Sequence, residues 1–306
     1  MAPSRRIISK RDLREDIKAA SIEFIGTFVF LLLALGAIQS VDLGVARTQG
    51  VEIAENGPRS TERNIYVSVA AGVSLLGSAW MFYRTTGGLF NPSVTLALRL
   101  IGQITTMQLV LYIIAQLVGS IAASAVILGL FPGPLFIRSK LGEGTTLAQG
   151  VFLEMFATSI LILAILMLAA EKSRATPMAP IGISMTLFAC HLFSISATGT
   201  SLNPARTFGP AVIAGFRSDH WVYWVGPFAG SCLSVAFYAW LKHTRYWDIN
   251  PHQMDTDPKE SPEDPVKGVK KDIRHAENQR TTSKSGRQNG ASGESGDEKR
   301  HGDQMV

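Results

Sequence analysis

Two tripeptides that share their first two residues stand out in this chain, Asn91-Pro92-Ser93 and Asn203-Pro204-Ala205. Each opens a short apolar stretch, one from Pro92 to Ile101 and the other from Pro204 to Ala214. Proline fits the first turn of a helix, and an Asn before it can cap that helix. Each stretch is about ten residues long, too short to cross a ~30 Å hydrocarbon core at about 1.5 Å per residue. The sequence therefore predicts two half-helices, each of which starts at its Asn.

Three ionisable residues lie in or beside apolar sequence: Glu23, Glu154 and Arg206, which directly follows the second tripeptide. Such residues are expensive inside a membrane and normally face a partner or a pathway. A proton-relay role for the carboxylates is the alternative. Because the two carboxylates occupy matched positions in the two halves of the chain, we expect a structural role instead. Each should accept hydrogen bonds from backbone N–H groups near an Asn-Pro loop.

The elements that must position these residues are apolar and long. The chain of 306 residues is 46% hydrophobic and 17% charged, and the charges gather at its two ends. Six apolar segments are long enough to span a bilayer, since a spanning helix needs about 20 residues. They run over 19–39, 65–83, 106–130, 148–169, 178–196 and 221–241. The first is longer than the apolar region of a signal peptide, so we expect a retained helix.

The two halves of the chain repeat one another. Glu23-Phe-Ile-Gly-Thr27 matches Glu154-Met-Phe-Ala-Thr158, and Gln116-Leu-Val-Gly119-Ser120 matches Pro227-Phe-Ala-Gly230-Ser231. Three spans per half is an odd number, so the second half enters the membrane from the opposite side, as an inverted repeat. The expected fold is an all-α membrane protein with six transmembrane helices and two re-entrant half-helices. Glycines are expected at close helix contacts: Gly26, Gly36, Gly72, Gly119, Gly226 and Gly230.

The distribution of charge and the composition predict the domain boundaries. Residues 1–18 form an N-terminal segment, and residues 19–247 form the membrane domain, with repeats at about 19–130 and 148–241. Residues 248–306 lack Phe, Trp and Tyr, so we expect this tail to be disordered. Basic residues near the span ends favour a cytoplasmic location for both termini under the positive-inside rule.

The inverted repeat has a consequence for transport. It brings the N-termini of the two half-helices together near the midplane, and each carries roughly half a positive charge. Two such ends facing one channel repel cations and protons, while a neutral molecule can accept hydrogen bonds from Asn91 and Asn203. The topology therefore predicts a conduit for small, neutral, polar solutes, because broken helices are tolerated where they line a watery cavity.

These motifs resemble the aquaporin (major intrinsic protein) family over residues 19–241. The residues that carry the resemblance are Thr198-Gly-Thr-Ser-Leu-Asn203-Pro-Ala-Arg206-Thr-Phe-Gly-Pro210 and Gly87-Gly-Leu-Phe-Asn91-Pro-Ser-Val-Thr-Leu96. The resemblance implies six tilted helices with two half-helices, a homotetramer with one pore per subunit, and a location in the lipid bilayer, with the plasma membrane favoured. Ser93 replaces the usual Ala of the first motif, and its small side chain should preserve the capping geometry.

The resemblance also implies a constriction lined by an aromatic residue, a His, a small residue and an Arg. Arg206, His191 and Thr200 match the last three positions, and Ala71 stands where water-specific members usually carry Phe. Pore diameter decides what passes. The missing ring predicts a wider constriction, so we expect passage of water and also of hydrogen peroxide or other small neutral solutes.

Other classes fit less well. A glycerol or small-polyol facilitator remains an alternative, although such members typically carry Gly in place of His191 and Asp in place of Thr207. A secondary transporter would need ion-coupling carboxylates beyond Glu23 and Glu154. No nucleophile–base pair or metal cluster is apparent, so we expect no enzyme, metal or cofactor, and the positive charge beside the spans does not indicate nucleic acid. Cys190 and Cys232 are expected to be small core residues.

Overall fold

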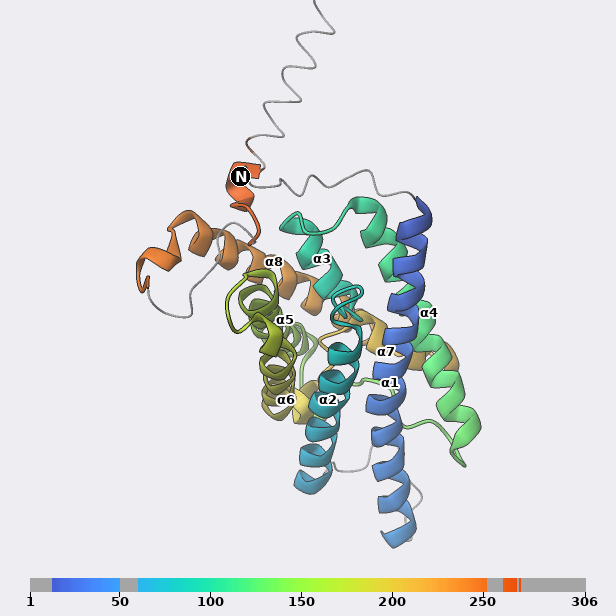
Figure 1. Ribbon diagram of the computed structural model, residues 1–306. Coiled ribbons are helices and arrows are strands. Elements are labelled where there is room, and N and C mark those ends of the chain that lie inside the picture. Colours follow the sequence, from blue (N-terminus) through green and yellow to red (C-terminus); the bar gives the residue numbers. More distant parts are fainter. Residues whose placement is uncertain (1–12, 50–59, 252–260, 269, 271–306) are drawn as a thin grey trace, which may run out of the picture. The chain divides into compact units, whose positions relative to one another are not determined.

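The computed structural model describes residues 13–49, 60–251, 261–268 and 270. In that part of the chain the secondary structure is helical (Figure 1). The α-helices are α1 (Leu13–Gln49), α2 (Thr61–Phe82), α3 (Pro92–Leu100), α4 (Thr106–Leu130), α5 (Leu147–Ile165), α6 (Ala179–Thr198), α7 (Pro204–Ala214) and α8 (Val222–His243). A π-helical turn, Leu166–Ala170, continues α5, and short 3-10 turns cover Thr176–Met178 and Tyr246–Asp248. The chain divides into two units at Pro262; α1 to α8 belong to the first, and residues 265–268 of the second are also helical.

Six of these helices are long and apolar enough to cross a membrane, namely α1, α2, α4, α5, α6 and α8. The other two, α3 and α7, are the half-helices that begin at Pro92 and Pro204. The predicted fold is confirmed, with shifts of a few residues at most boundaries. The largest difference is in α1, which runs from Leu13 to Gln49 rather than over 19–39, because the helix continues past the apolar segment at both ends.

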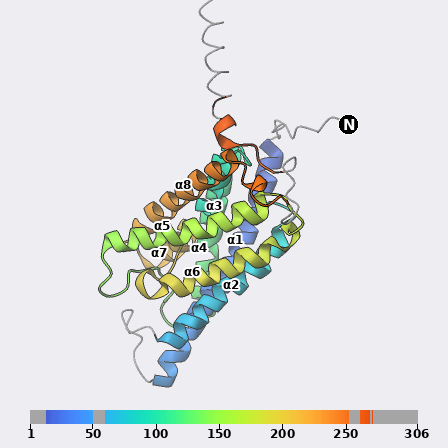
Figure 2. The same ribbon diagram turned by 90° about the vertical axis from the view of Figure 1, so that its left-hand side faces the viewer.

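Packing follows the internal repeat. α1 packs along α4 in the first half, and α5 packs along α8 in the second. The halves meet where α2 lies beside α6, which both views show (Figures 1 and 2). Each half-helix also contacts a long helix of the other half, α3 against α8 and α7 against α4. The two repeats are therefore interlocked.

Matched glycines permit the closest helix approaches. A Cβ atom on Gly119 would lie 2.8 Å from the Phe24 carbonyl oxygen of α1, and one on Gly230 would lie 2.5 Å from the Met155 carbonyl oxygen of α5. Gly26, Gly72 and Gly226 are similarly crowded. The expectation for Gly36 is wrong, because no described residue beyond its own stretch of helix backbone lies within 4 Å of its Cβ position.

Two further expectations concern the cysteines and the tail. Cys190 is buried, but Cys232 is exposed, so the prediction of a core position for Cys232 is wrong: its side of α8 faces away from the bundle. Most of the tail predicted to be disordered lies outside the described residues. Within them, Asp248 belongs to a 3-10 turn and the Ser261 hydroxyl accepts a hydrogen bond from the Lys172 backbone N–H at 2.8 Å.

Candidate functional site

The loops that lead into the two half-helices share an unusual backbone. Phe90 and Leu202, which directly precede the two Asn residues, have φ values of 51° and 54°. Such a conformation costs a bulky side chain on the order of 1–3 kcal/mol and persists only where neighbours enforce it. Glycines take the same region at Gly87 and Gly199, where no Cβ opposes it. The repeat is therefore preserved in backbone geometry as well as in sequence.

Glu23 holds the first loop in this conformation. Its carboxylate is fully buried and accepts hydrogen bonds from the backbone N–H groups of Leu89 and Phe90, at 3.2 and 3.0 Å. The Thr86 hydroxyl donates to it at 2.5 Å and the Gln116 amide at 3.0 Å. The carboxylate thus supplies the acceptors that the tightly turned loop cannot find in its own backbone.

Glu154 does the same for the second loop. Its carboxylate accepts from the backbone N–H groups of Ser201 and Leu202, at 2.9 and 2.8 Å, and from the Thr198 hydroxyl at 2.7 Å. It too is fully buried. Neither Glu23 nor Glu154 is among the described residues that line the cavity between the loops. Their hydrogen bonds thus go to the two loops and not to the cavity.

The two Asn side chains join the loops to one another. The Asn91 amide nitrogen donates to the Leu202 carbonyl at 2.8 Å, and the Asn203 amide nitrogen donates to the Phe90 carbonyl at 2.9 Å. Each amide oxygen caps its own half-helix, accepting from the Ser93 N–H at 2.8 Å or the Ala205 N–H at 2.9 Å. Pro92 and Pro204 occupy the first helical turn, where a missing N–H does no harm.

One serine fixes each half-helix to the opposite repeat. The Ser120 hydroxyl of α4 donates to the Ala205 carbonyl at 2.5 Å, and the Ser231 hydroxyl of α8 donates to the Ser93 carbonyl at 2.8 Å. The hydroxyl of Ser93 itself is buried and has no hydrogen-bond partner in the structure. The departure from Ala in the first motif therefore leaves the cap intact and adds no contact of its own.

A cavity of about 360 Å³ runs between the two halves. Asn91 and Asn203 line it, and so do Ala71, His191 and Arg206. The structure thus brings three of the four predicted constriction residues to one cavity. Thr200 is the exception, because it is fully buried outside the lining, with its hydroxyl 2.8 Å from that of Ser194.

The polar groups of His191 and Arg206 have defined partners. The Nδ1 atom of His191 lies 3.0 Å from the Leu187 carbonyl oxygen. A carbonyl can only accept, so Nδ1 donates, and in a neutral ring Nε2 remains as an acceptor. The Nη1 atom of Arg206 donates to the Ser139 hydroxyl. Sequence reasoning missed Ser139, because it lies in a connecting segment with no periodic pattern and no match in the other repeat.

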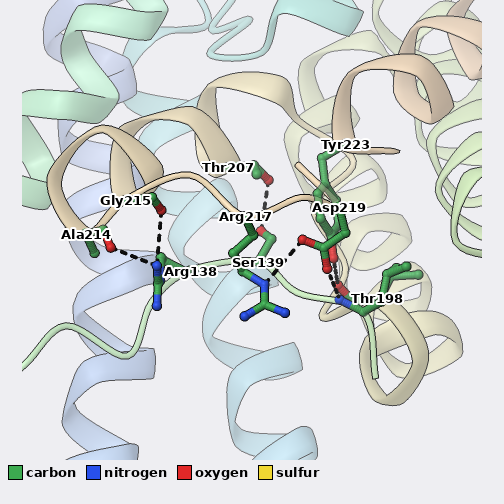
Figure 3. A network of polar contacts seen from close by, with 10 residues as sticks. Arg138, Ser139, Thr198, Thr207, Ala214, Gly215, Arg217, Asp219 and Tyr223 are labelled. Atoms are coloured by element: carbon green, nitrogen blue, oxygen red, sulfur yellow. Dashed lines mark hydrogen bonds and ion pairs between the residues drawn. The ribbon is translucent and has the colours of Figure 1, made fainter. Parts of the chain in front are cut away.

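The segment that carries Ser139 is held against α7 and the loop that follows it (Figure 3). The Arg138 Nη1 atom donates to the carbonyls of Ala214 and Gly215, at 2.7 and 3.1 Å. The Asp219 carboxylate accepts from the Leu141 backbone N–H at 3.1 Å. Together these contacts fix the position of the segment that reaches Arg206.

The opposite end of the cavity is lined by Tyr83, Lys172 and Thr176. Next to them, the buried carboxylate of Glu171 pairs with the Lys242 ammonium at 2.9 Å and accepts from the Tyr246 hydroxyl at 2.9 Å. The π-helical turn places Glu171 there, since the Glu171 N–H bonds the Leu166 carbonyl at 2.8 Å. This end is thus tied to α8 by a buried ion pair.

Comparison with known proteins gives concordant results. The chain matches the family described as major intrinsic protein over residues 11–238. It is 52% identical over 255 residues to Aquaporin-1 of Laccaria bicolor, covering 82% of this chain and 80% of that protein. It is 43% identical over 248 residues to Aquaporin-1 of Gibberella zeae, covering 80% and 76%. The aquaglyceroporin structure from Plasmodium falciparum aligns with a TM-score of 0.61 at 18% identity, over 74% of this chain and 96% of that one, which shows likeness of fold.

Proposed function

The chain belongs to the major intrinsic protein family and is a multi-pass membrane channel of that family, and we propose that it conducts water through the cavity between its two Asn-Pro loops. One observation carries the proposal. The Asn91 and Asn203 amides, each donating to the other loop, both lie on the cavity wall. An amide nitrogen has two hydrogens, and only one is used in that bond. The second hydrogen of each amide supplies a donor for the oxygen of a passing water.

The same arrangement opposes ions. Asn91 and Asn203 are the N-caps of α3 and α7, so the positive ends of two helix dipoles face one cavity. Arg206 adds a permanent positive charge to the wall nearer the Ser139 segment. A cation would lose hydration without gaining an acceptor at these points, whereas a neutral solute exchanges hydrogen bonds.

The direct test is osmotic. Liposomes that contain the purified protein should shrink rapidly when the external osmolarity is raised in a stopped-flow experiment. The rate of water loss should not saturate and should not depend on an ion gradient. An Asn203→Leu variant, which removes both the cap and the donor, should conduct far less. Uptake that saturates and follows an ion gradient would indicate a transporter and overturn the proposal.

We further propose that the channel passes hydrogen peroxide as well as water, because Ala71 presents a small side chain to the cavity that His191 and Arg206 also line. An Ala71→Phe variant should lower the peroxide-to-water permeability ratio. Val73→Phe is the matched control, since Val73 lies on the same helix with 61% of its surface exposed. A ratio unchanged in Ala71→Phe would contradict the proposal.

Assembly and orientation are part of the same proposal. We expect a homotetramer with one pore per subunit, in the plasma membrane, with both termini in the cytoplasm. The ends of α2, α5 and α8 near residues 84, 172, 174, 242 and 245 carry basic side chains on that side. Mass measurement in detergent tests the tetramer. Protease protection of a C-terminal tag in sealed cells tests the orientation.

A further inference from the structure

We propose that Ser139, Thr207 and Ser201 are specificity-determining positioning residues, which hold Arg206 at the cavity wall through one directed chain of hydrogen bonds. The proposal rests on the function proposed above, because it concerns how the channel sets its selectivity. It adds three residues from separate segments of the polypeptide that contact Arg206 directly or through one another, and of these Ser201 also lines the cavity.

The contacts run without a gap from the guanidinium to the backbone. Arg206 Nη1 contacts the Ser139 hydroxyl, which lies 2.8 Å from the Thr207 hydroxyl. Figure 3 shows this second contact, with Thr207 above Ser139. The Thr207 hydroxyl lies 2.5 Å from that of Ser201, which in turn donates to the Asn203 carbonyl at 2.8 Å. All of these side chains are buried.

The direction of the hydrogens follows from the two ends. A guanidinium only donates, so Ser139 accepts from Arg206 and keeps its own hydrogen, which Thr207 accepts because the hydrogen of Thr207 goes to Ser201. A carbonyl only accepts, so Ser201 gives its hydrogen to Asn203 and must accept from Thr207. Every hydroxyl then donates once, away from the arginine. The orientation of the whole chain is therefore set by the charge at one end and the capping residue at the other.

This orientation has an electrostatic consequence. The hydroxyl dipoles align with their oxygen ends towards Arg206, which stabilises a positive charge whose residue is only 8% exposed. Hydrogen bonds to an ionised group are stronger than neutral ones, so the contact to Ser139 fixes one edge of the guanidinium. The guanidinium is rigid and planar, so fixing one edge also fixes how far the others project into the cavity. The chain thereby sets the aperture.

The series of hydrogen bonds also connects Arg206 to the midplane of the channel. It ends on the backbone carbonyl of Asn203, the residue whose side chain caps α7 and contacts Phe90. A disturbance at Ser139 is therefore transmitted first to Arg206 and only weakly to Asn203. Selectivity should change before water conduction does.

The experiment compares the permeability of liposomes to urea and to water. Ser139→Ala should raise the urea-to-water ratio by about two- to tenfold, the range that the net contribution of one ordinary hydrogen bond represents. Ser139→Thr keeps the hydroxyl and should restore the wild-type ratio. Ser184→Ala is the matched control, because the Ser184 hydroxyl is also buried but has no hydrogen-bond partner among the described residues and does not line the cavity.

A residue further from Arg206 in the series of hydrogen bonds gives a second, independent test of the urea-to-water ratio. Thr207→Val keeps the side-chain shape but removes the acceptor for Ser139, so it should raise the ratio less than Ser139→Ala does. If Ser139→Ala does not fold, Thr207→Val decides the matter by itself. A wild-type ratio in both variants, or an equal rise in Ser184→Ala, overturns the inference. Absence of water conduction in the wild type would instead overturn the proposed function.

Discussion

The two halves of the channel share a skeleton, meaning the contacts that fix the backbone of the loops and half-helices. They differ in the side chains that this skeleton carries. In both, a buried carboxylate holds a strained loop, an Asn caps a half-helix, and a serine from the other repeat bonds the second carbonyl of the half-helix. The two Asn residues exchange bonds almost symmetrically, at 2.8 and 2.9 Å. The contacts that fix the backbone are therefore duplicated.

The differences gather one turn further along each half-helix. Val94 in α3 stands where α7 has Arg206, and both line the cavity. Thr95 turns to the Gln116 amide, 2.9 Å away, so the polar contacts of the first half close within the bundle. Its counterpart Thr207 turns to Ser139 and Ser201 and so towards the arginine. At this turn the first half presents an apolar side chain to the cavity, whereas the second half presents a permanent positive charge.

The strongest test addresses the shared skeleton. Glu23→Leu and Glu154→Leu should each destabilise the protein severely and to a similar extent, because each leaves two buried backbone N–H groups without an acceptor. At about 1–3 kcal/mol for each group, the expected loss is about 2–6 kcal/mol. Thermal unfolding in detergent measures it, with the exposed Glu15→Leu as control. If only one of the two variants is unstable, the halves are not equivalent supports.

The next test addresses the difference between the halves. Arg206→Val gives α7 the residue that α3 has at the matched position, Val94. Water conduction should persist, while urea permeability should rise by about tenfold, the order of a hydrogen bond to a charged group. Arg245→Val is the control, because Arg245 is exposed and does not line the cavity. Unchanged urea permeability in Arg206→Val would place selectivity elsewhere.

The sequence predicts the skeleton well because each part of it is local or repeated. The Asn caps with their following prolines, the six spans and the matched carboxylates all follow from residue type, spacing and length. The side-chain contacts that differ between the halves are harder to predict, because they depend on segments brought together from distant parts of the chain. Ser139 reaches Arg206 across 67 positions, and no periodicity marks it.

Thr200 shows the same limit from the other side. Its position in the motif predicts a pore residue, yet its side chain turns to Ser194 and lies outside the cavity lining. The backbone there has a φ of 50°, so the direction of the side chain is set by the loop and not by the spacing of the motif. Residue spacing predicts where a residue stands along the chain, but the local backbone decides where its side chain points.

A smaller effect is expected where the skeleton itself departs from symmetry. Gly26 in α1 matches Ala157 in α5, and a Cβ on Gly26 would lie 2.0 Å from the Phe90 ring. The matched residue of Phe90 is Leu202, which has no ring. Gly26→Ala should therefore cost about 1–3 kcal/mol by overpacking.

Phe90→Leu in the same chain should relieve part of that cost, since the pair then copies the second half. The thermal unfolding of the two single variants and the double variant forms a cycle that measures this coupling. Strictly additive losses would show that the clash is absorbed elsewhere, for example by Phe30 or Phe82, whose rings lie 6.3 and 5.8 Å from that of Phe90.

The smallest expected effect distinguishes the loops that follow the two half-helices. The second loop contains His220, and the first, residues 101–105, has no titratable side chain. Burial lowers the pKa of His220 from its ordinary 6.5, while the neighbouring Asp219, itself paired with Arg217, opposes the shift. The Trp224 indole N–H also donates to His220 Nε2 at 3.1 Å, which requires that nitrogen to be unprotonated.

The sign of the pH effect follows from these contacts. Below its ordinary pKa the histidine binds a proton more readily in the unfolded chain than in the folded one, so stability is fully present above pH 6.5 and falls as the pH drops towards the lowered pKa of the folded state. Lowering the pH from about 7.5 to about 5 should therefore reduce the unfolding temperature of the wild type more than that of His220→Gln, which stays neutral but still offers an acceptor to Trp224. If the unfolding temperature changes equally with pH in the two proteins, His220 contributes no pH dependence to stability and the second loop resembles the first.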